Sequence, residues 1–142
     1  MQSLVALFGA LLGGFLVLLG DLVRRKFERR KEEVGRLVEA SAQLASTYNR
    51  LCGQFIDAAE AGVAVSDLPV ADPLRYEAAT RFFMTPGSEQ LGAQAARLIG
   101  AYTELRRVYG QDSTWSAARD EHGTAVREFE AAVRLVMHRN HI

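Results

Sequence analysis

The chain has 142 residues, of which 49% are hydrophobic, and its 17 basic and 17 acidic side chains leave no formal net charge. That balance argues against general electrostatic binding to nucleic acid. One cysteine cannot form an internal disulfide, and no pair of Cys or His has the spacing of a structural zinc site. We therefore expect one domain-sized fold that is held together by packing alone.

The run from Leu4 to Leu19 contains no polar side chain, and its neighbours Ser3 and Gly20 are uncharged. As a helix, this segment would be about 27 Å long, close to the roughly 30 Å hydrocarbon thickness of a bilayer. The alternatives are a buried soluble helix and a cleaved signal peptide. A signal peptide carries basic residues before its apolar run, whereas here they follow it. The pattern predicts a transmembrane anchor over residues 1–22.

A membrane-surface basic cluster is predicted on a juxtamembrane helix over residues 23–33. Its members are Arg24, Arg25, Lys26, Arg29, Arg30 and Lys31. Because positively charged flanks stay on the cytoplasmic side, we expect the N-terminus outside a bacterial inner membrane and the C-terminal domain in the cytoplasm. Opposite charges also lie one helical turn apart: Arg24 with Glu28, Arg29 with Glu33, and Glu32 with Arg36. An ion-paired, solvated helix surface is therefore favoured over recognition of one particular lipid.

Small residues in the apolar run share a predicted transmembrane helix-packing face. The face consists of Ala6, Gly9, Ala10, Gly13 and Gly14. A helix face of small residues lets a second transmembrane helix approach closely, because helix association in lipid depends on packing. The alternative is that Gly and Ala are simply common in membrane helices.

One long helix is predicted to leave the membrane and to end near Gly62. Its apolar residues have heptad-like spacing: Val34, Leu37, Leu44, Tyr48, Leu51 and Phe55. A short helix follows over Leu74–Met84, with Asp72 as its cap and Pro73 in its first position. It is expected to bury Leu74, Ala78 and Phe82, with Phe83 as a further candidate.

Two more helices are predicted from apolar stripes. The first stripe contains Leu91, Ala95, Leu98, Tyr102, Leu105 and Tyr109. Gly110 ends that helix, and Asp112 or Ser113 caps the next one. The second stripe contains Trp115, Ala118, Ala125, Phe129, Ala132, Val133 and Val136. No strand signal competes with these periods.

The predicted fold class is all-α, with an N-terminal transmembrane helix joined to an antiparallel cytoplasmic helical bundle over residues 34–142. The bundle has three long helices and one short helix. With about 110 residues, it can bury a modest core. The apolar stripes could also be shared with a copy of the chain or with another subunit.

No catalytic, cofactor-binding or metal-binding residue is predicted. The paired Glu-x-x-His motifs of di-iron bundles are missing from the sequence, as are glycine-rich phosphate loops. His122 lies on an apolar stripe, where a satisfied or edge-of-core imidazole is favoured over a catalytic one. Cys52 is interpreted as a small buried hydrophobe rather than a nucleophile.

A Gly/Ala-rich single span, an Arg-rich exit (RRKFERRKEE) and a helical domain together resemble a diffuse group of uncharacterised, mostly actinobacterial, small single-span membrane proteins. Arg outnumbers Lys by 15 to 2, which is similar to the usage of GC-rich bacterial or phage genomes. The resemblance implies a bacterial source and no particular activity. Some antiviral defence effectors are similar in architecture, because they too are membrane-anchored helical bundles.

These patterns favour a non-enzymatic interaction protein, a single-pass accessory subunit or scaffold without a cofactor. Its expected partners are the lipid bilayer and another membrane protein or copies of itself. Nucleic acid and small-molecule substrates are not expected. The alternative is a membrane-perturbing effector of a bacterial defence or toxin system, and an enzyme with an unrecognised site is the least favoured interpretation.

Overall fold

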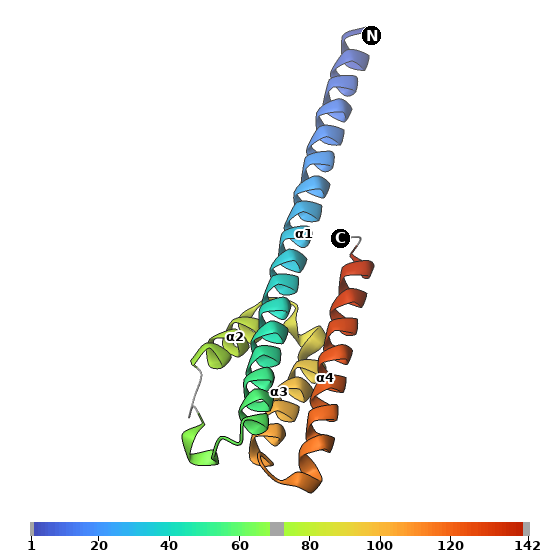
Figure 1. Cartoon of the computed structure of the whole chain (residues 1–142). Helices are drawn as coiled ribbons and strands as arrows, with labels where there is room; N and C mark the ends of the chain where they lie inside the picture. Colours follow the sequence, from blue (N-terminus) through green and yellow to red (C-terminus); the bar gives the residue numbers. More distant parts are fainter. Residues whose placement is uncertain (1, 69–72, 141–142) are drawn as a thin grey trace. The chain divides into compact units, whose positions relative to one another are not determined.

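The computed structural model describes residues 2–68 and 73–140, and the side chains of these residues except 2–15 and 112. This part of the chain contains four α-helices and two short 3₁₀ helices (Figure 1). In chain order they are α1 (Gln2–Glu60), η1 (Val65–Asp67), α2 (Pro73–Met84), η2 (Ser88–Leu91), α3 (Gly92–Arg107) and α4 (Asp112–Arg139). No strand occurs among the described residues. The predicted all-α class is confirmed.

The chain divides into two units, Met1–Glu33 and Val34–Ile142, and α1 contributes to both. In the first unit, every described side chain is exposed. Within the residues that the structure describes, none of the helices combines the length and the apolar character that crossing a membrane requires. Most of the predicted span, Leu4–Leu19, lies outside the residues whose side chains are described. The transmembrane anchor therefore stays a prediction.

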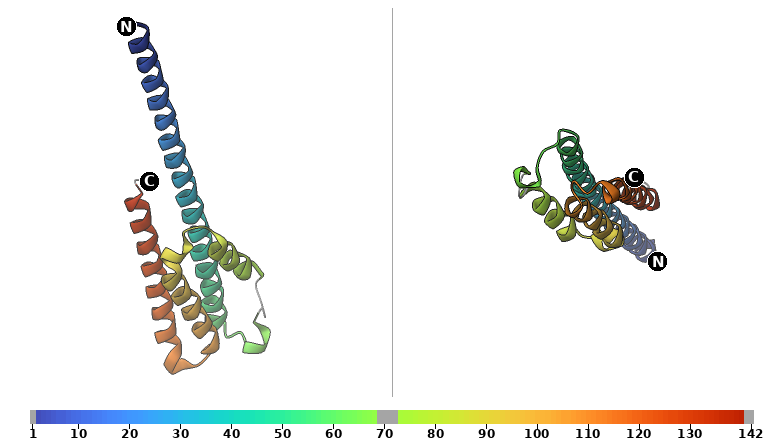
Figure 2. Two further views of the ribbon diagram at one scale, coloured as in Figure 1. Left: turned by 180° about the vertical axis from the view of Figure 1, so that it is seen from behind. Right: turned by 60° about the horizontal axis from the view of Figure 1, so that its bottom comes forward.

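The second unit is a helical bundle. In this unit, α1 and α3 run in one direction and α4 returns beside them, while the shorter α2 packs across the other helices (Figures 1 and 2). One hydrophobic cluster draws side chains from all four helices. Its largest fully buried members are Phe82, Phe129, Leu37, Leu44, Leu91 and Leu98. The rings of Phe82 and Phe129 meet edge to face, with 5.7 Å between their centroids, and so join α2 to α4.

The predicted apolar stripes of α1, α3 and α4 are buried or half-buried, so the periodicity located the core correctly. The prediction for α2 was partly wrong. Ala78 and Phe82 are buried, but Leu74 is 49% exposed and Phe83 is 48% exposed. Leu74 shares the helix face of Ala78 and Phe82 but lies in the first turn, at the end of α2, whereas Phe83 points about 100° away from Phe82. A helix of 12 residues with one packed face leaves such positions outside the core.

Glycines terminate two helices as predicted. Gly62 and Gly110 have φ values of +70° and +75°, a conformation that a side chain disfavours. The predicted cap of α4 was wrong, because Asp112 is already the first helical residue. Gln111 occupies the cap position without a side-chain hydrogen bond, and its carbonyl accepts the first turn's N–H groups. Asp112 therefore starts α4 instead of capping it.

Candidate functional site

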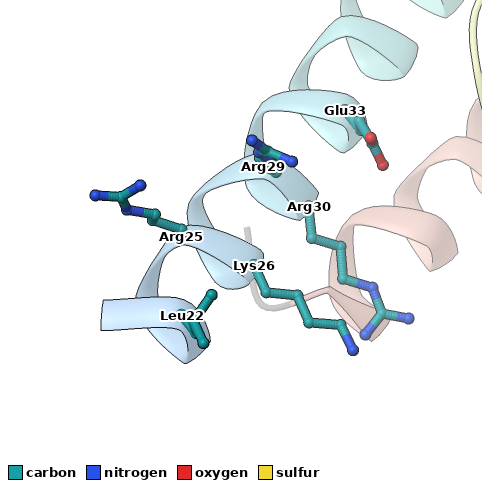
Figure 3. Close-up of a pocket in the computed structure, with 6 residues that line it drawn as sticks. All are labelled: Leu22, Arg25, Lys26, Arg29, Arg30 and Glu33. Atoms are coloured by element: carbon teal, nitrogen blue, oxygen red, sulfur yellow. The ribbon is translucent and has the colours of Figure 1, made fainter. Parts of the chain in front are cut away.

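The predicted basic cluster lies on the exposed part of α1 in the first unit. Figure 3 shows Arg25, Lys26, Arg29 and Arg30 on the same stretch of helix as Leu22. Since each residue turns the helix by about 100°, these four basic residues share one side, whereas Arg24 and Lys31 lie on the other. The cluster is therefore not one continuous patch. Four of its six members form a basic surface, and two lie behind it.

Ion pairs neutralise part of this cluster. Arg24 Nε lies 3.0 Å from Glu28 Oε1, which confirms one of the predicted pairs. Arg25 Nη2 lies 3.1 Å from Asp21 Oδ2, a pair that was not predicted. In the described part of the chain, Lys26, Arg29, Arg30 and Lys31 form no ion pair, so the predicted bond between Arg29 and Glu33 is not made. Exposed pairs of this kind contribute little to stability, typically below about 1 kcal/mol.

The predicted transmembrane helix-packing face lies outside the described side chains. Its members are Ala6, Gly9, Ala10, Gly13 and Gly14, all within residues 2–15. The face therefore stays a prediction. Immediately after it, the described apolar residues of α1 are all exposed: Leu16, Val17, Leu18, Leu19, Leu22 and Val23.

His122 is more deeply buried than predicted. It is 2% exposed, so an edge-of-core position was wrong, and its Nε2 atom has no hydrogen-bond partner among the described residues. Burial lowers the pKa of the imidazole, because the charged form loses its hydration. The adjacent Glu121 is exposed, which confirms that the two side chains lie on different sides of α4.

Cys52 packs against Leu105, Val108 and Ala118 in a second hydrophobic cluster. Burial raises the pKa of its thiol, and the positive charge of Arg119 opposes that shift only in part. A thiol with a raised pKa is a poor nucleophile at neutral pH. The interpretation of Cys52 as a buried hydrophobe is confirmed.

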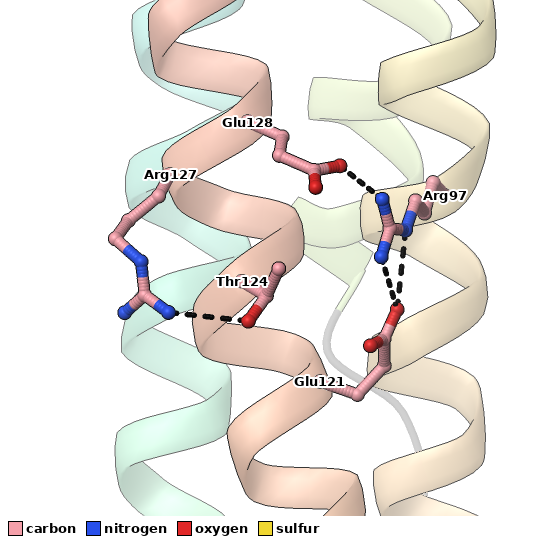
Figure 4. Close-up of polar contacts among 5 residues, drawn as sticks. All are labelled: Arg97, Glu121, Thr124, Arg127 and Glu128. Carbon is pink, nitrogen blue, oxygen red and sulfur yellow. Dashed lines mark hydrogen bonds and ion pairs between the residues drawn. The ribbon is translucent and has the colours of Figure 1, made fainter.

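The link between α3 and α4 was missed by sequence reasoning. Arg97 of α3 donates from Nη2 and Nε to Glu121 Oε1, at 2.8 and 3.1 Å, and its Nη1 contacts Glu128 (Figure 4). These contacts raise the pKa of Arg97, chiefly through the hydrogen bond to Glu121. A local sequence pattern does not show which residues of different helices meet. The one available signal was the spacing of Glu121 and Glu128, which are seven residues apart and therefore lie on the same side of α4.

A second interhelical cluster was also missed. The guanidinium carbon of Arg75 lies 4.4 Å from the ring centroid of Tyr76 and 5.8 Å from that of Tyr102. Tyr102 in turn meets Tyr48 edge to face, with 5.2 Å between centroids. Burial raises the pKa of Tyr48, so its phenol stays protonated at neutral pH. The cluster joins α1, α2 and α3 through aromatic and cation–π contacts.

Among the residues that the structure describes, no group of three or more His, Cys, Asp or Glu side chains is placed to hold a metal ion. Comparisons with protein-family models, with curated proteins and with solved structures find no match to this chain. The resemblance to the actinobacterial group therefore stays a prediction, and function is inferred from the residues themselves.

Proposed function

We propose that this chain is a non-enzymatic interaction protein that is anchored in a bacterial inner membrane by one N-terminal helix. The bundle of residues 34–142 faces the cytoplasm and docks onto a membrane complex or onto a copy of the chain. The anchor is formed by the apolar run Leu4–Leu19, and the small-residue face of that run packs against another transmembrane helix.

The observation that carries this proposal is the change of side-chain character along the exposed surface of α1. Leu16, Val17 and Leu18 are each more than 60% exposed. Exposed apolar area costs about 25 cal/mol per Å² in water, and a bilayer would remove that cost. The basic residues begin at Arg24, just over one helical turn after Leu19, and Asp21 lies between them. An apolar helix end followed by cations is the arrangement of a span that meets the cytoplasmic headgroups.

The basic surface supports the orientation more strongly than it supports lipid recognition. Arg25 is already paired with Asp21, so three of the four cations on that surface remain for anionic headgroups. Each could contribute about 1 kcal/mol at most, which is enough to favour one topology.

Fractionation tests the anchor directly. A C-terminally tagged full chain, expressed in bacteria, is expected to sediment with membranes and to stay there after an alkaline wash. Protease added to intact cells is expected to leave the tag uncut, because the bundle faces the cytoplasm. A chain that stays in the high-speed supernatant, or a tag cut from outside, would overturn the proposal.

A triple substitution tests the helix-packing face. Gly9→Leu, Gly13→Leu and Gly14→Leu together are expected to reduce assembly in mild detergent, as measured by crosslinking or native mass. The control is Phe8→Leu with Phe15→Leu, which alters the apolar run but not its small residues. Unchanged assembly in the triple variant would remove span packing from the proposal. Collapse of the membrane potential upon expression would instead favour a membrane-perturbing effector.

A further inference from the structure

A pocket of about 290 Å³ lies at the end of the second unit where α1 stops and α3 turns into α4 (Figure 1). Four segments line it: the last turn of α1, the loop after α1, the loop between α3 and α4, and the first turns of α4. Because these segments are far apart in the chain, no local sequence pattern predicts the pocket. Its volume is at the lower end of the range for ligand sites, so it suits a small molecule.

A hydrogen bond and a ring contact hold the walls of this pocket in place. The Tyr109 hydroxyl donates to the carbonyl oxygen of Val63 at 3.0 Å, which ties the α3–α4 loop to the loop after α1. The ring of Tyr109 meets the ring of Trp115 edge to face, with 5.5 Å between their centroids. Together with Ala59, these residues give the pocket an apolar lining. Since the walls are already fixed, little ordering is needed when an apolar group enters.

Three polar groups of the lining have no partner within the described residues. Glu60 and Arg119 form no ion pair, either with each other or with another described residue. The positive charge of Arg119 acts on the thiol of Cys52, so its guanidinium extends toward α1. The indole Nε1–H of Trp115 makes no hydrogen bond in the described part of the chain and is not fully buried. The pocket therefore offers one carboxylate and two donors to a ligand.

The signs of the two charges decide which ligand fits. A simple anion that paired with Arg119 would bring its charge toward Glu60, and a simple cation would meet the reverse problem. Both side chains are exposed, so water weakens each single contact and a ligand that pairs with only one of them gains little. A ligand that carries a carboxylate and an ammonium group close together can pair with both.

We propose that this pocket binds a free α-amino acid with an apolar side chain. The carboxylate accepts hydrogen bonds from Arg119 and from the indole of Trp115, and the ammonium group donates to Glu60. The apolar side chain lies against Val63 and Tyr109. The chain binds this ligand without a reaction, and the site does not depend on the membrane anchor. Because the pocket joins the end of α1 to the start of α4, the ligand stabilises the folded bundle.

Ligand analogues test the proposal in the full chain in mild detergent. Trp115 is the single tryptophan, so its fluorescence reports binding at this pocket. L-leucine, L-methionine and L-phenylalanine are titrated, and at least one is expected to change the fluorescence with saturation and to raise the midpoint of thermal unfolding. The analogues of that amino acid without the amino group or without the carboxyl group should each bind at least about tenfold more weakly.

Two further probes test the need for an apolar side chain. Glycine lacks it, and so does phosphoethanolamine, the zwitterion of a common lipid headgroup. Both are expected to bind more weakly than the apolar amino acid, since neither covers the aromatic lining. Tighter binding of phosphoethanolamine would identify a lipid headgroup as the ligand and overturn the amino acid.

Substitutions test the two charged contacts separately. Arg119→Gln and Glu60→Gln are each expected to weaken binding of the amino acid about tenfold, as measured by equilibrium dialysis of the labelled ligand. Glu60→Gln should also abolish the preference for the amino acid over its deaminated analogue, an effect that a merely structural role would not produce. The controls Arg134→Gln and Glu130→Gln, at exposed positions of α4 outside the pocket, should leave binding unchanged.

The outcomes concern the pocket alone. Absence of binding by all three amino acids, equal binding of the deaminated analogue to the parent chain, or equal losses in the control variants would each overturn the proposal. None of these results bears on the membrane anchor, which fractionation tests.

Discussion

Phe27 and Phe129 are the same residue type in the same kind of secondary structure, yet 71% of Phe27 is exposed and Phe129 is fully buried. The first lies in the unit Met1–Glu33, where every described side chain is exposed. The second lies at the centre of a core that four helices share. Helix formation by itself therefore says nothing about burial. What covers an apolar side chain decides its contribution to stability, and for the apolar run Leu4–Leu19 of the first unit the proposed cover is a bilayer.

The largest expected effect tests this contrast with one substitution in each unit. Phe129→Ala should lower the free energy of unfolding by about 3–5 kcal/mol, because it removes buried apolar area and leaves a cavity. Phe27→Ala should change it by less than about 0.5 kcal/mol. The measurement is urea unfolding of the full chain in mild detergent, followed by the fluorescence of Trp115, the single tryptophan. Similar effects of the two substitutions would contradict the contrast.

The next prediction concerns two glycines of the bundle, whose substitution by Ala should change the free energy of unfolding in opposite directions. Gly110→Ala should destabilise the bundle by about 1–2 kcal/mol, because the φ of +75° places an added Cβ close to the following carbonyl. Gly100→Ala should stabilise it by up to about 1 kcal/mol, since Ala is the better helix former and an added Cβ meets nothing within 4 Å. Thermal unfolding of both variants gives the two signs. If both substitutions changed the stability in the same direction, the backbone conformation of Gly110 would not be the cause of its effect.

Acidification should weaken the core through His122. Burial holds the pKa of this imidazole below its ordinary value of 6.5, so the unfolded chain binds more protons as the pH falls through that value. The free energy of unfolding should therefore decrease as the pH falls from about 7.5 to about 5.5. His122→Gln should flatten this slope, whatever its effect on stability at neutral pH. The exposed His138→Gln serves as the control, and an equal flattening there would rule out His122 as the source.

The smallest effect concerns the exposed bridge from Arg97 to Glu121. A double-mutant cycle with Arg97→Met and Glu121→Gln should give a favourable coupling at low ionic strength that disappears at high salt. Solvent screens this bridge, so its coupling should be weaker than the three effects above. A coupling that persists in about 1 M salt would show that the bridge is shielded from water.

Much of the fold follows from local patterns. Apolar residues of α3 such as Leu98 and Leu105 recur with helical period, and both are buried. Gly62 and Gly110 were recognised as stops because their preference for positive φ is intrinsic to the residue. The exposure of Leu74 and Phe83 was not predicted, because it depends on how much of a short helix its neighbours cover.

The candidate sites divide in the same way. The basic cluster and its orientation signal are properties of consecutive residues, so the sequence alone determined them, together with the order of the four α-helices. Only the tertiary structure decided that Glu60 lines a pocket with Arg119, that Arg97 reaches α4, and that His122 is fully buried. These features depend on contacts between residues far apart in the chain, where packing chooses among many pairings that no local period distinguishes.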